Sequence, residues 1–213
     1  MWPEGEKTLT LLAEIREGDR QALNVLIDRH RAAVRRLVNM RMDRAIAQRV
    51  DASDIVQDVM FEASRRLEQY IQNPAMPFHV WLRQLAKDRI IDMHRRHRVA
   101  RKRSVDREQP VVSIGDDDAS AADLAQLLYD AELTPAAASV RREIEQRFVE
   151  AVNLLDDADR EIIMMRHFEH LTSADAAQAL KLTSAAVGMR YLRAMRKLRD
   201  SLGDSDPVTF GTS

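Results

Sequence analysis

Two pairs of histidines come closest to a metal-binding pattern in this sequence. His94 and His97 are three residues apart, as are His167 and His170, and on a helix this spacing places both imidazoles of a pair on one face. Arginines surround the first pair, so their charge would repel a cation, and the second pair lies at an expected helix end. We therefore expect no metal site.

The sequence offers no other catalytic arrangement. It contains no cysteine, which excludes a disulfide framework, a thiol nucleophile, Cys-ligated zinc and an iron–sulfur cluster. It also lacks a Gly-rich phosphate loop, a nucleophile elbow and an HExxH motif. We therefore expect a protein that is not an enzyme and that uses neither a cofactor nor a small-molecule substrate.

Two helical segments near the C-terminus predict a helix-turn-helix. Thr172 can cap a short helix over 173–180, Lys181-Leu182-Thr183 forms a short connection, and Thr183 can cap a longer helix. The longer helix is basic and carries Arg190, Arg193, Arg196, Lys197 and Arg199. Its first turns could enter a major groove while its later cations meet phosphates. The alternative is a solvated basic helix in a bundle.

The segment 78–107 combines aromatic and basic residues. Phe78 and Trp81 belong to the apolar face of an expected helix, and Arg83 and Lys87 lie on another face. From residue 83 onward the segment has ten Lys and Arg but three acidic residues. Such a surface suits a nucleic-acid backbone and unstacked bases. Alternatively, Phe78 and Trp81 are core residues, which is the commoner fate of aromatics at helical spacing.

A polar helix face is predicted a little earlier in the chain. Asp54, Gln57, Asp58 and Phe61 are spaced so that they share one face, while apolar residues occupy the rest of the helix. This face could dock a partner helix. From the spacing alone the alternative is favoured, in which the acids only interact with the helix dipole and Phe61 points inward.

Helices are needed to position these residues, and the composition favours an all-α protein. The 213 residues include only six Gly and six Pro, which disfavours a fold of many short strands. Apolar periodicity and capping residues predict helices over 7–17, 20–40, 78–98, 136–155, 157–168, 173–180 and 184–201, and one that follows the caps Asp51 and Ser53 and ends near 71. The buried stripe of the second helix is predicted to be Leu23, Leu26, Ile27, Val34, Leu37 and Val38.

Charge divides the chain into two small helical domains joined by an acidic linker. The net charge is only −1, but residues 108–132 contain seven acids and no Lys or Arg. We expect one domain over 1–105, the linker over 106–135, a second domain over 136–202 and a polar tail over 203–213. The sequence shows neither a secretory signal nor an apolar run that could span a membrane, so a cytoplasmic protein is expected.

Together these segments resemble an extracytoplasmic-function (ECF) sigma factor, a compact two-domain initiation factor of bacterial RNA polymerase. DASDIVQDVMFEA (51–63) resembles the family's region 2.2, and PFHVWLRQLAKDRIIDMHRRHR (77–98) resembles regions 2.3 and 2.4. LTSADAAQALKLTSAAVGMRYLRAMRKLR (171–199) resembles region 4.2, and 18–42 fits region 2.1. The resemblance implies an all-α chain with a region 2 bundle and a region 4 helix-turn-helix.

The resemblance also implies partners and the residues that bind them. The β′ coiled coil of core RNA polymerase would be bound by Asp54, Gln57, Asp58 and Phe61, and the β flap would be a second contact. The −10 element would be melted and held by Asn73, Phe78, Trp81, Arg83, Lys87, Arg95, Arg96 and Arg98. The −35 element would be read by Thr183, Ser184, Ala185, Arg190, Arg193, Arg196 and Lys197. Many such factors act at the nucleoid and are held by an anti-sigma protein.

Some residues depart from the family's pattern. Asp88 stands where region 2.3 usually has Asn, and beside single-stranded DNA its charge is unfavourable unless it pairs, with Arg89 or Arg95. Lys181 stands in a turn that often has Gly or Asn, and a left-handed conformation there would cost Lys more. Gly188-Met189 replaces a common Lys-Ser, which removes an expected DNA contact.

Two other functions stay open. A helix-turn-helix repressor or activator that works without polymerase would need a dimer and a palindromic site, and it would leave the polar face around Asp54 and the acidic linker unexplained. A helical adaptor whose basic patches touch RNA is the second alternative.

Overall fold

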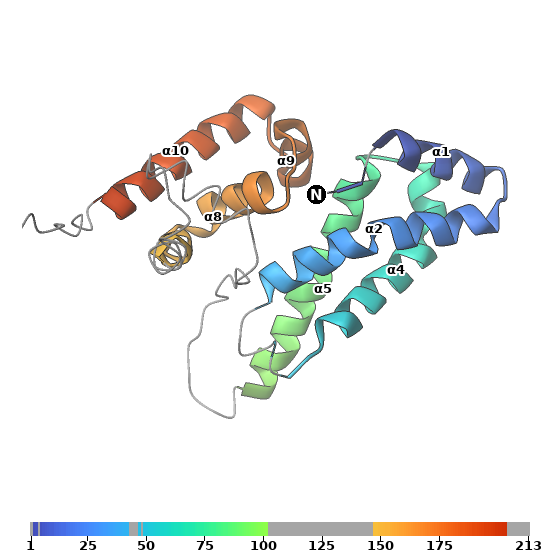
Figure 1. Cartoon of the computed structure of the whole chain (residues 1–213), viewed down its shortest axis with the longest axis horizontal. Coiled ribbons are helices and arrows are strands. Elements are labelled where there is room, and N and C mark those ends of the chain that lie inside the picture. The colour runs from blue at the N-terminus through green and yellow to red at the C-terminus, as the bar shows by residue number, and fades with distance from the viewer. Residues whose placement is uncertain (1, 4, 43–46, 48, 102–146, 204–213) are drawn as a thin grey trace, which may run out of the picture. The chain divides into compact units, whose positions relative to one another are not determined.

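Helices are the regular elements of the computed structural model, which describes residues 2–3, 5–42, 47, 49–101 and 147–203. They are α1 (Gly5–Arg16), α2 (Arg20–Arg41), α4 (Ala52–Gln72), α5 (Phe78–Arg101), α8 (Asp157–Ile163), the π-helical turn η2 (Met164–Phe168), α9 (Ser173–Leu180) and α10 (Ser184–Gly203) (Figure 1). Residues 147–154 are helical as well. The described part of the chain contains no strand, so the predicted all-α class is confirmed.

The chain divides into two compact units. Helices α1, α2, α4 and α5 form the N-terminal unit, whereas α8, η2, α10 and most of α9 belong to the C-terminal unit. The predicted linker 106–135 and the residues 204–213 of the predicted tail lie outside the described residues. None of the helices that the structure describes has the length and apolarity to cross a membrane.

The connection between α1 and α2 follows from two adjacent residues. Gly18 adopts a φ of 99°, and its N–H donates to the carbonyl of Ile15 while the N–H of Asp19 donates to Glu14. This Schellman pattern ends α1, and glycine adopts the required left-handed conformation without strain. The carboxylate of Asp19 then accepts from the N–H of Gln21 at 2.7 Å and begins α2, as predicted.

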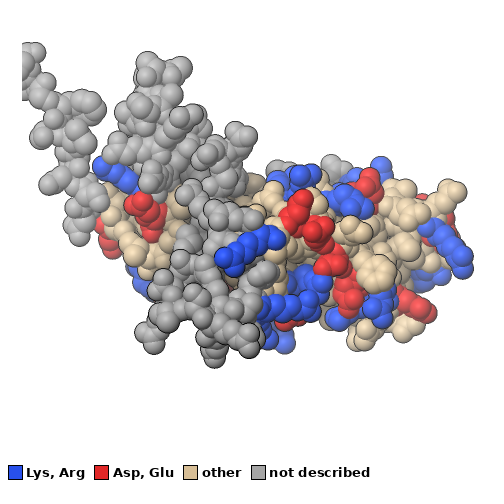
Figure 2. Space-filling model, turned by 90° about the horizontal axis from the view of Figure 1, so that it is seen from below, with Lys and Arg blue, Asp and Glu red and all other residues tan. Residues whose placement is uncertain are grey.

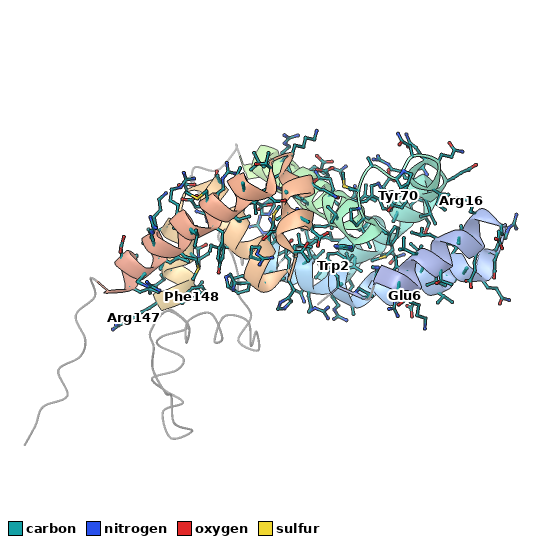
Figure 3. All side chains as sticks on the ribbon, turned by 90° about the horizontal axis from the view of Figure 1, so that it is seen from above. Trp2, Glu6, Arg16, Tyr70, Arg147 and Phe148 are labelled. Carbon is teal, nitrogen blue, oxygen red and sulfur yellow. The ribbon has the colours of Figure 1, made fainter. Side chains whose placement is uncertain are left out.

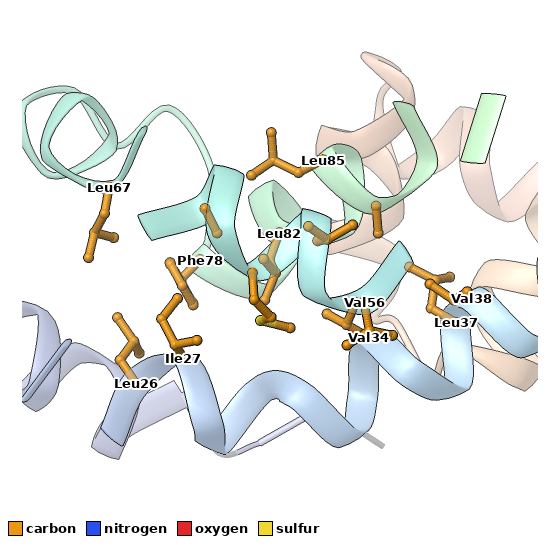
Figure 4. Packing of buried hydrophobic residues seen from close by; sticks show 14 of the residues in the cluster. Leu26, Ile27, Val34, Leu37, Val38, Val56, Leu67, Phe78, Leu82 and Leu85 are labelled. Carbon is orange, nitrogen blue, oxygen red and sulfur yellow. The ribbon is translucent and has the colours of Figure 1, made fainter. Parts of the chain in front are cut away.

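The core of the N-terminal unit lies between α2, α4 and α5, with α1 packed on α2. Most of the predicted stripe of α2 is buried, while Leu23 is only partly buried. Figure 4 shows the side chains of α2, α4 and α5 that point into this core. These include Val34 from α2, Val56 from α4 and Leu82 from α5. Each of these helices buries one face in the core and leaves its other face at the surface.

In the C-terminal unit, the predicted helix over 157–168 is divided. Its last turn is the π-helical η2, in which the N–H of Glu169 donates to the carbonyl of Met164 at 2.9 Å. The wider turn buries Met164, Met165 and Phe168 together. The 3.6-residue periodicity that predicted this helix could not reveal its π-helical turn. Met164, Met165 and Phe168 lie within five positions, which is too short a stretch to distinguish the two kinds of turn.

Candidate functional site

The predicted polar face of α4 lies on the surface of the N-terminal unit. Buried Ile55, Val56, Val59 and Met60 hold the helix against the core, whereas Asp54, Gln57, Asp58 and Phe61 are exposed. The side chain of Phe61 is 63% exposed, so the alternative in which it points inward is wrong. We call these four exposed residues the α4 face.

The two acids of the α4 face differ in their surroundings. Asp58 forms an ion pair with Arg89 of α5, whose Nε also donates to Oδ2 of Asp58 at 3.1 Å. Among the described residues Asp54 has no ion-pair partner. The guanidinium of Arg65 lies 5.8 Å from the ring centroid of Phe61, a cation–π distance. Figure 2 shows that acidic and basic side chains are interspersed with uncharged surface on one face of this unit.

The aromatic residues near the start of α5 form a packed chain of rings. Trp81 is half-buried, with its ring centroid 4.8 Å from that of Tyr70 and 5.5 Å from that of Phe78. The hydroxyl of Tyr70 donates to the carbonyl of Met76 at 2.9 Å and so fixes the loop between α4 and α5. Phe78 is only 3% exposed, so its ring has no free face for a base. The alternative of a core position therefore applies to Phe78, and Trp81 lies at the border of the core.

Trp2 extends this aromatic cluster, which the sequence alone did not reveal. Its ring lies 6.4 Å from that of His30 on α2 and 6.0 Å from that of His79 on α5. Figure 3 labels the side chain of Trp2. Burial lowers the pKa of His30, whose Nδ1 lies 2.9 Å from the carbonyl of Leu26. Trp2 therefore ties the start of the chain to the end of α5 that begins at Phe78.

The cations predicted for the −10 element lie at different depths. Arg83 is 1% exposed and belongs to the core of its unit. Lys87 is half-buried, whereas Arg95, Arg96 and the C-cap residue Asn73 of α4 are exposed. Of Arg98 only the backbone is described. The surface of α5 that can meet a phosphate is therefore formed by its later turns.

Asp88 does not pair with either arginine that the sequence suggested. Its Oδ1 accepts from Nε2 of Gln84 at 3.0 Å, one helical turn earlier. Arg89 pairs with Asp58 instead, and Arg95 lies 4.0 Å from Asp92. In this structure Asp88 is therefore bound by an amide and not neutralised by an arginine, and Arg89 and Arg95 each lie near another carboxylate.

The helix-turn-helix is formed by α9 and α10. Thr172 caps α9 through its Oγ1, which accepts from the N–H of Asp175 at 3.1 Å, and the carboxylate of Asp175 accepts from the N–H of Thr172. This reciprocal arrangement is a capping box. Thr183 caps α10 through its Oγ1, which accepts from the N–H of Ala186 at 3.2 Å. Both predicted caps are confirmed.

The turn between these helices places Lys181 in a left-handed conformation. Its φ is 55°, and its N–H donates to the carbonyl of Gln178 while the N–H of Leu182 donates to Ala177. This is the same Schellman pattern that ends α1 at Gly18. The turn therefore keeps the left-handed geometry that normally selects glycine, although Lys occupies it.

Two of the predicted DNA-binding cations take part in an ion-pair network within the unit. Arg193 donates to Oδ1 of Asp159 at 3.1 Å, and Lys197 donates to Oδ2 of the same carboxylate at 2.6 Å. Lys197 also donates to Asp156 at 2.7 Å. The carboxylate of Asp159 is fully buried, so this network fixes α10 to the beginning of α8. The hydrogen bond from Lys197, together with the backbone N–H of Asp159, lowers the pKa of Asp156 to about 2.

The other residues predicted to read the −35 element lie at the start and along the outside of α10. Thr183, Ser184, Ala185 and Arg196 are exposed and Arg190 is half-buried. The sequence analysis missed Met189 and Leu192, which are 69% and 52% exposed on this helix. The sequence did contain a sign of this exposed surface. Met189 and Leu192 follow Ala185 by four and seven residues, which places them on the side of the helix opposite the buried stripe.

The ring of His167, from the second histidine pair, is packed within the C-terminal unit. Among the residues that the structure describes, no group of three or more His, Asp or Glu side chains is placed to hold a metal ion. Nε2 of His167 lies 2.8 Å from the hydroxyl of Tyr191, and the two rings stack with centroids 5.5 Å apart. Burial lowers the pKa of His167 to about 4, with a smaller effect from Arg166. His167 therefore belongs to the packing between η2 and α10.

Comparisons with known proteins assign both units to one kind of protein. The family model "Sigma-70 region 2" matches residues 26–100, and "Sigma-70, region 4" matches residues 145–198.

Similar curated proteins carry related names. "ECF RNA polymerase sigma factor SigD" of Mycobacterium tuberculosis is 25% identical, with 95% of this chain and 87% of that protein covered. "RNA polymerase sigma-H factor" of Pseudomonas aeruginosa is also 25% identical, with 92% and 94% covered.

Two solved structures have a similar fold. CnrH in complex with the cytosolic domain of CnrY matches with a TM-score of 0.56 and 20% identity, and the match covers 94% of this chain and 99% of CnrH. The sigma factor RpoE of Bartonella quintana in complex with the anti-sigma factor NepR matches with a TM-score of 0.52 and 18% identity, over 88% and 98% of the two chains.

Proposed function

The chain belongs to the ECF sigma factors of bacterial RNA polymerase, and from that premise we propose how its two units divide the work. The N-terminal unit, within residues 1–105, binds core polymerase and holds the melted −10 element. The C-terminal unit, within 136–202, places α10 in the major groove of the −35 element. The acidic segment 106–135 joins them, and a factor of this kind works in the cytoplasm, where its polymerase is.

The α4 face carries this proposal. It presents a carboxylate at Asp54 that has no ion-pair partner among the described residues, an amide at Gln57 and a largely exposed ring at Phe61. A helix that needed only to stabilise its own unit would bury such a ring, since an exposed phenyl group loses the gain of burial. An exposed aromatic beside polar groups is typical of a binding hot spot. The β′ coiled coil of core polymerase is the partner that we propose for this face.

The proposed DNA contacts follow from exposure. On the N-terminal unit they are Asn73, the half-buried Trp81 and Lys87, and the exposed Arg95 and Arg96. On the C-terminal unit they are the first turn of α10 and Arg196, with Arg190 at the flank. Phosphate contacts by such cations make the affinity fall steeply with salt. Arg193 and Lys197 serve DNA binding indirectly, because they hold α10 on α8.

Two further partners are proposed by analogy. Contact with the β flap is assigned to the C-terminal unit. Because the similar RpoE was solved with an anti-sigma factor, a protein inhibitor of the same kind is the other partner.

A binding experiment with sigma-free core polymerase tests the role of the α4 face. We expect the charge reversal Asp54→Lys to weaken core binding by about tenfold, since it places a cation where the partner meets an anion. The matched control is Asp28→Lys on α2. The side chain of Asp28 is 81% exposed and, within the part of the chain that the structure describes, pairs with Arg31 alone. Core affinity that responds equally to both reversals, or to neither, would contradict the proposed docking face.

A further inference from the structure

The outward side of α10 is apolar over its first half. Ala185, Met189 and Leu192 follow one another at spacings of four and three residues and so lie on one face of the helix. Val187, Ala194 and Leu198, on the opposite side, are fully buried. The exposed residues therefore point directly away from the unit's own core.

The first half of this face, from Ala185 to Leu192, has no side chain that could make paired hydrogen bonds to a base. At Gly188 an added Cβ would meet nothing within 4 Å, so the neighbouring surface is open as well as apolar. Arg190 is half-buried and lies on the flank of the helix, and Arg193 and Lys197 are engaged with Asp159. The usual bidentate contacts of Arg, Asn or Gln with purines are thus unavailable at the centre of the face.

Cations continue the same face toward the end of α10. Arg196 follows Leu192 by four residues and Arg199 follows by seven, and both are exposed. Among the described residues neither has an ion-pair partner. An apolar patch followed along the helix by two available cations complements a polyanion that also presents apolar groups. In the major groove that apolar group is the C5-methyl of thymine, and phosphates meet the cations.

We propose that Met189 and Leu192, on the apolar face that begins at Ala185, select the −35 element by contact with thymine methyl groups. This inference rests on the proposed function, in which α10 enters the major groove. It predicts that the −35 element contains T·A base pairs. The side chains of α10 would contact the thymine methyl groups of these pairs and not their hydrogen-bonding atoms.

The test replaces thymine by uracil, which removes the methyl group and keeps the base pairing. The holoenzyme is formed from sigma-free core polymerase and the full chain, and a promoter is taken from its run-off transcripts on upstream DNA fragments. The probe is that promoter with thymine or with uracil in the −35 segment alone. We expect about fourfold weaker binding for each methyl group that is contacted, from the loss of one buried apolar carbon.

Substitutions show which side chains detect the methyl group. In Met189→Ala with Leu192→Ala the thymine and uracil promoters should bind equally, whereas Leu154→Ala should keep the difference. Leu154 is a fair control because it is 81% exposed in the same unit but lies outside α10. All three residues are exposed, and circular dichroism verifies that the variants fold.

Each other outcome contradicts the inference in a different way. A holoenzyme that initiates but binds both promoters equally would overturn methyl recognition and leave the proposed function intact. A difference that persists in the double variant would assign the recognition to other residues. Loss of core binding by the double variant would identify the face as a protein-docking surface. If no holoenzyme forms, the proposed function fails and this inference fails with it.

Discussion

In the N-terminal unit the acids of α4 stand on the surface, whereas in the C-terminal unit two cations of α10 are bound to a buried carboxylate. Asp54 has no ion-pair partner among the described residues, and Asp58 shares a half-exposed pair with Arg89. Asp159 is fully buried and holds both Arg193 and Lys197. The first arrangement leaves charge for a partner, and the second uses charge to assemble the unit.

This difference shows why charge in a sequence does not by itself identify a binding surface. A surface ion pair contributes little to stability, so evolution is free to use its members for binding. A buried carboxylate, by contrast, must keep its cations, because losing them leaves an uncompensated charge. The position of the partner residue therefore decides whether a cation of a basic helix is available to DNA.

The largest loss of stability is expected at Asp159, where a substitution tests whether burial distinguishes the two ion pairs. Asp159→Ala removes a buried carboxylate that accepts hydrogen bonds from two cations. Since a hydrogen bond to a charged group contributes about 1.5–3 kcal/mol, the loss of both should destabilise the C-terminal unit by about 3 kcal/mol. Amide hydrogen exchange of α8 and α10 measures the loss. The counterpart Asp58→Ala removes a half-exposed pair and should cost less than about 1 kcal/mol in the N-terminal unit. Equal costs at the two sites would show that burial does not distinguish the pairs.

A substitution of Phe61 tests whether the α4 face serves partner binding and not the stability of its own unit. Its ring is 63% exposed, so Phe61→Ala should leave the stability of the N-terminal unit nearly unchanged. Because exposed aromatics act as hot spots, core polymerase affinity should fall by about 30-fold, which corresponds to about 2 kcal/mol. Isothermal titration with sigma-free core polymerase measures the affinity. An unchanged affinity would place the docking surface elsewhere.

Acid should weaken the C-terminal unit through His167. Its pKa lies near 4 in the folded unit, below the usual 6.5, so the folded unit binds this proton less readily than the unfolded chain. The contribution of the neutral His167 ring to the free energy of unfolding is complete above pH 6.5 and is lost as the pH falls toward 4. Because the ring is partly exposed, we expect a loss of about 1 kcal/mol.

The measurement compares hydrogen exchange in α10 at pH 7 and pH 5, corrected for the intrinsic exchange rate. His167→Gln should remove this part of the pH dependence. A dependence that survives the substitution would assign the titration to another group.

The smallest expected effect concerns the two Schellman turns. Gly18 and Lys181 both have a positive φ, but only glycine adopts it without strain. Lys181→Gly should therefore stabilise the C-terminal unit by about 0.5–1 kcal/mol, whereas Gly18→Ala should destabilise the N-terminal unit by about 1 kcal/mol. Thermal unfolding of each variant gives the sign. If both substitutions changed the stability in the same direction, the two turns would not share one conformation.

Local sequence signals were sufficient for most of the fold. The caps at Asp19, Thr172 and Thr183 and the apolar stripe of α2 are interactions between residues close in sequence, so periodicity and capping rules predicted them. The α4 face was predicted as a set for the same reason. The spacing alone could not establish that this face is exposed, because only packing against α2 and α5 shows which side of α4 is covered.

Several of the predicted DNA-binding cations make contacts with residues far away in the sequence, which helical spacing did not show. Arg193 and Lys197 meet Asp159 from 34 and 38 residues away, and Arg89 meets Asp58 across 31 residues. Arg83 lies in the core despite its charge. Helical spacing cannot show which cation will find a buried acid, whereas the exposed Met189 was readable from its position opposite the buried stripe.

Run-off transcription tests the central claim most directly. Sigma-free core polymerase, with and without this protein, is given a library of upstream DNA fragments from the host, and the transcript starts are sequenced. The account predicts starts that require the protein and share one pair of −35 and −10 elements. Starts that are the same with and without the protein, or a protein that never binds the core enzyme, would contradict it.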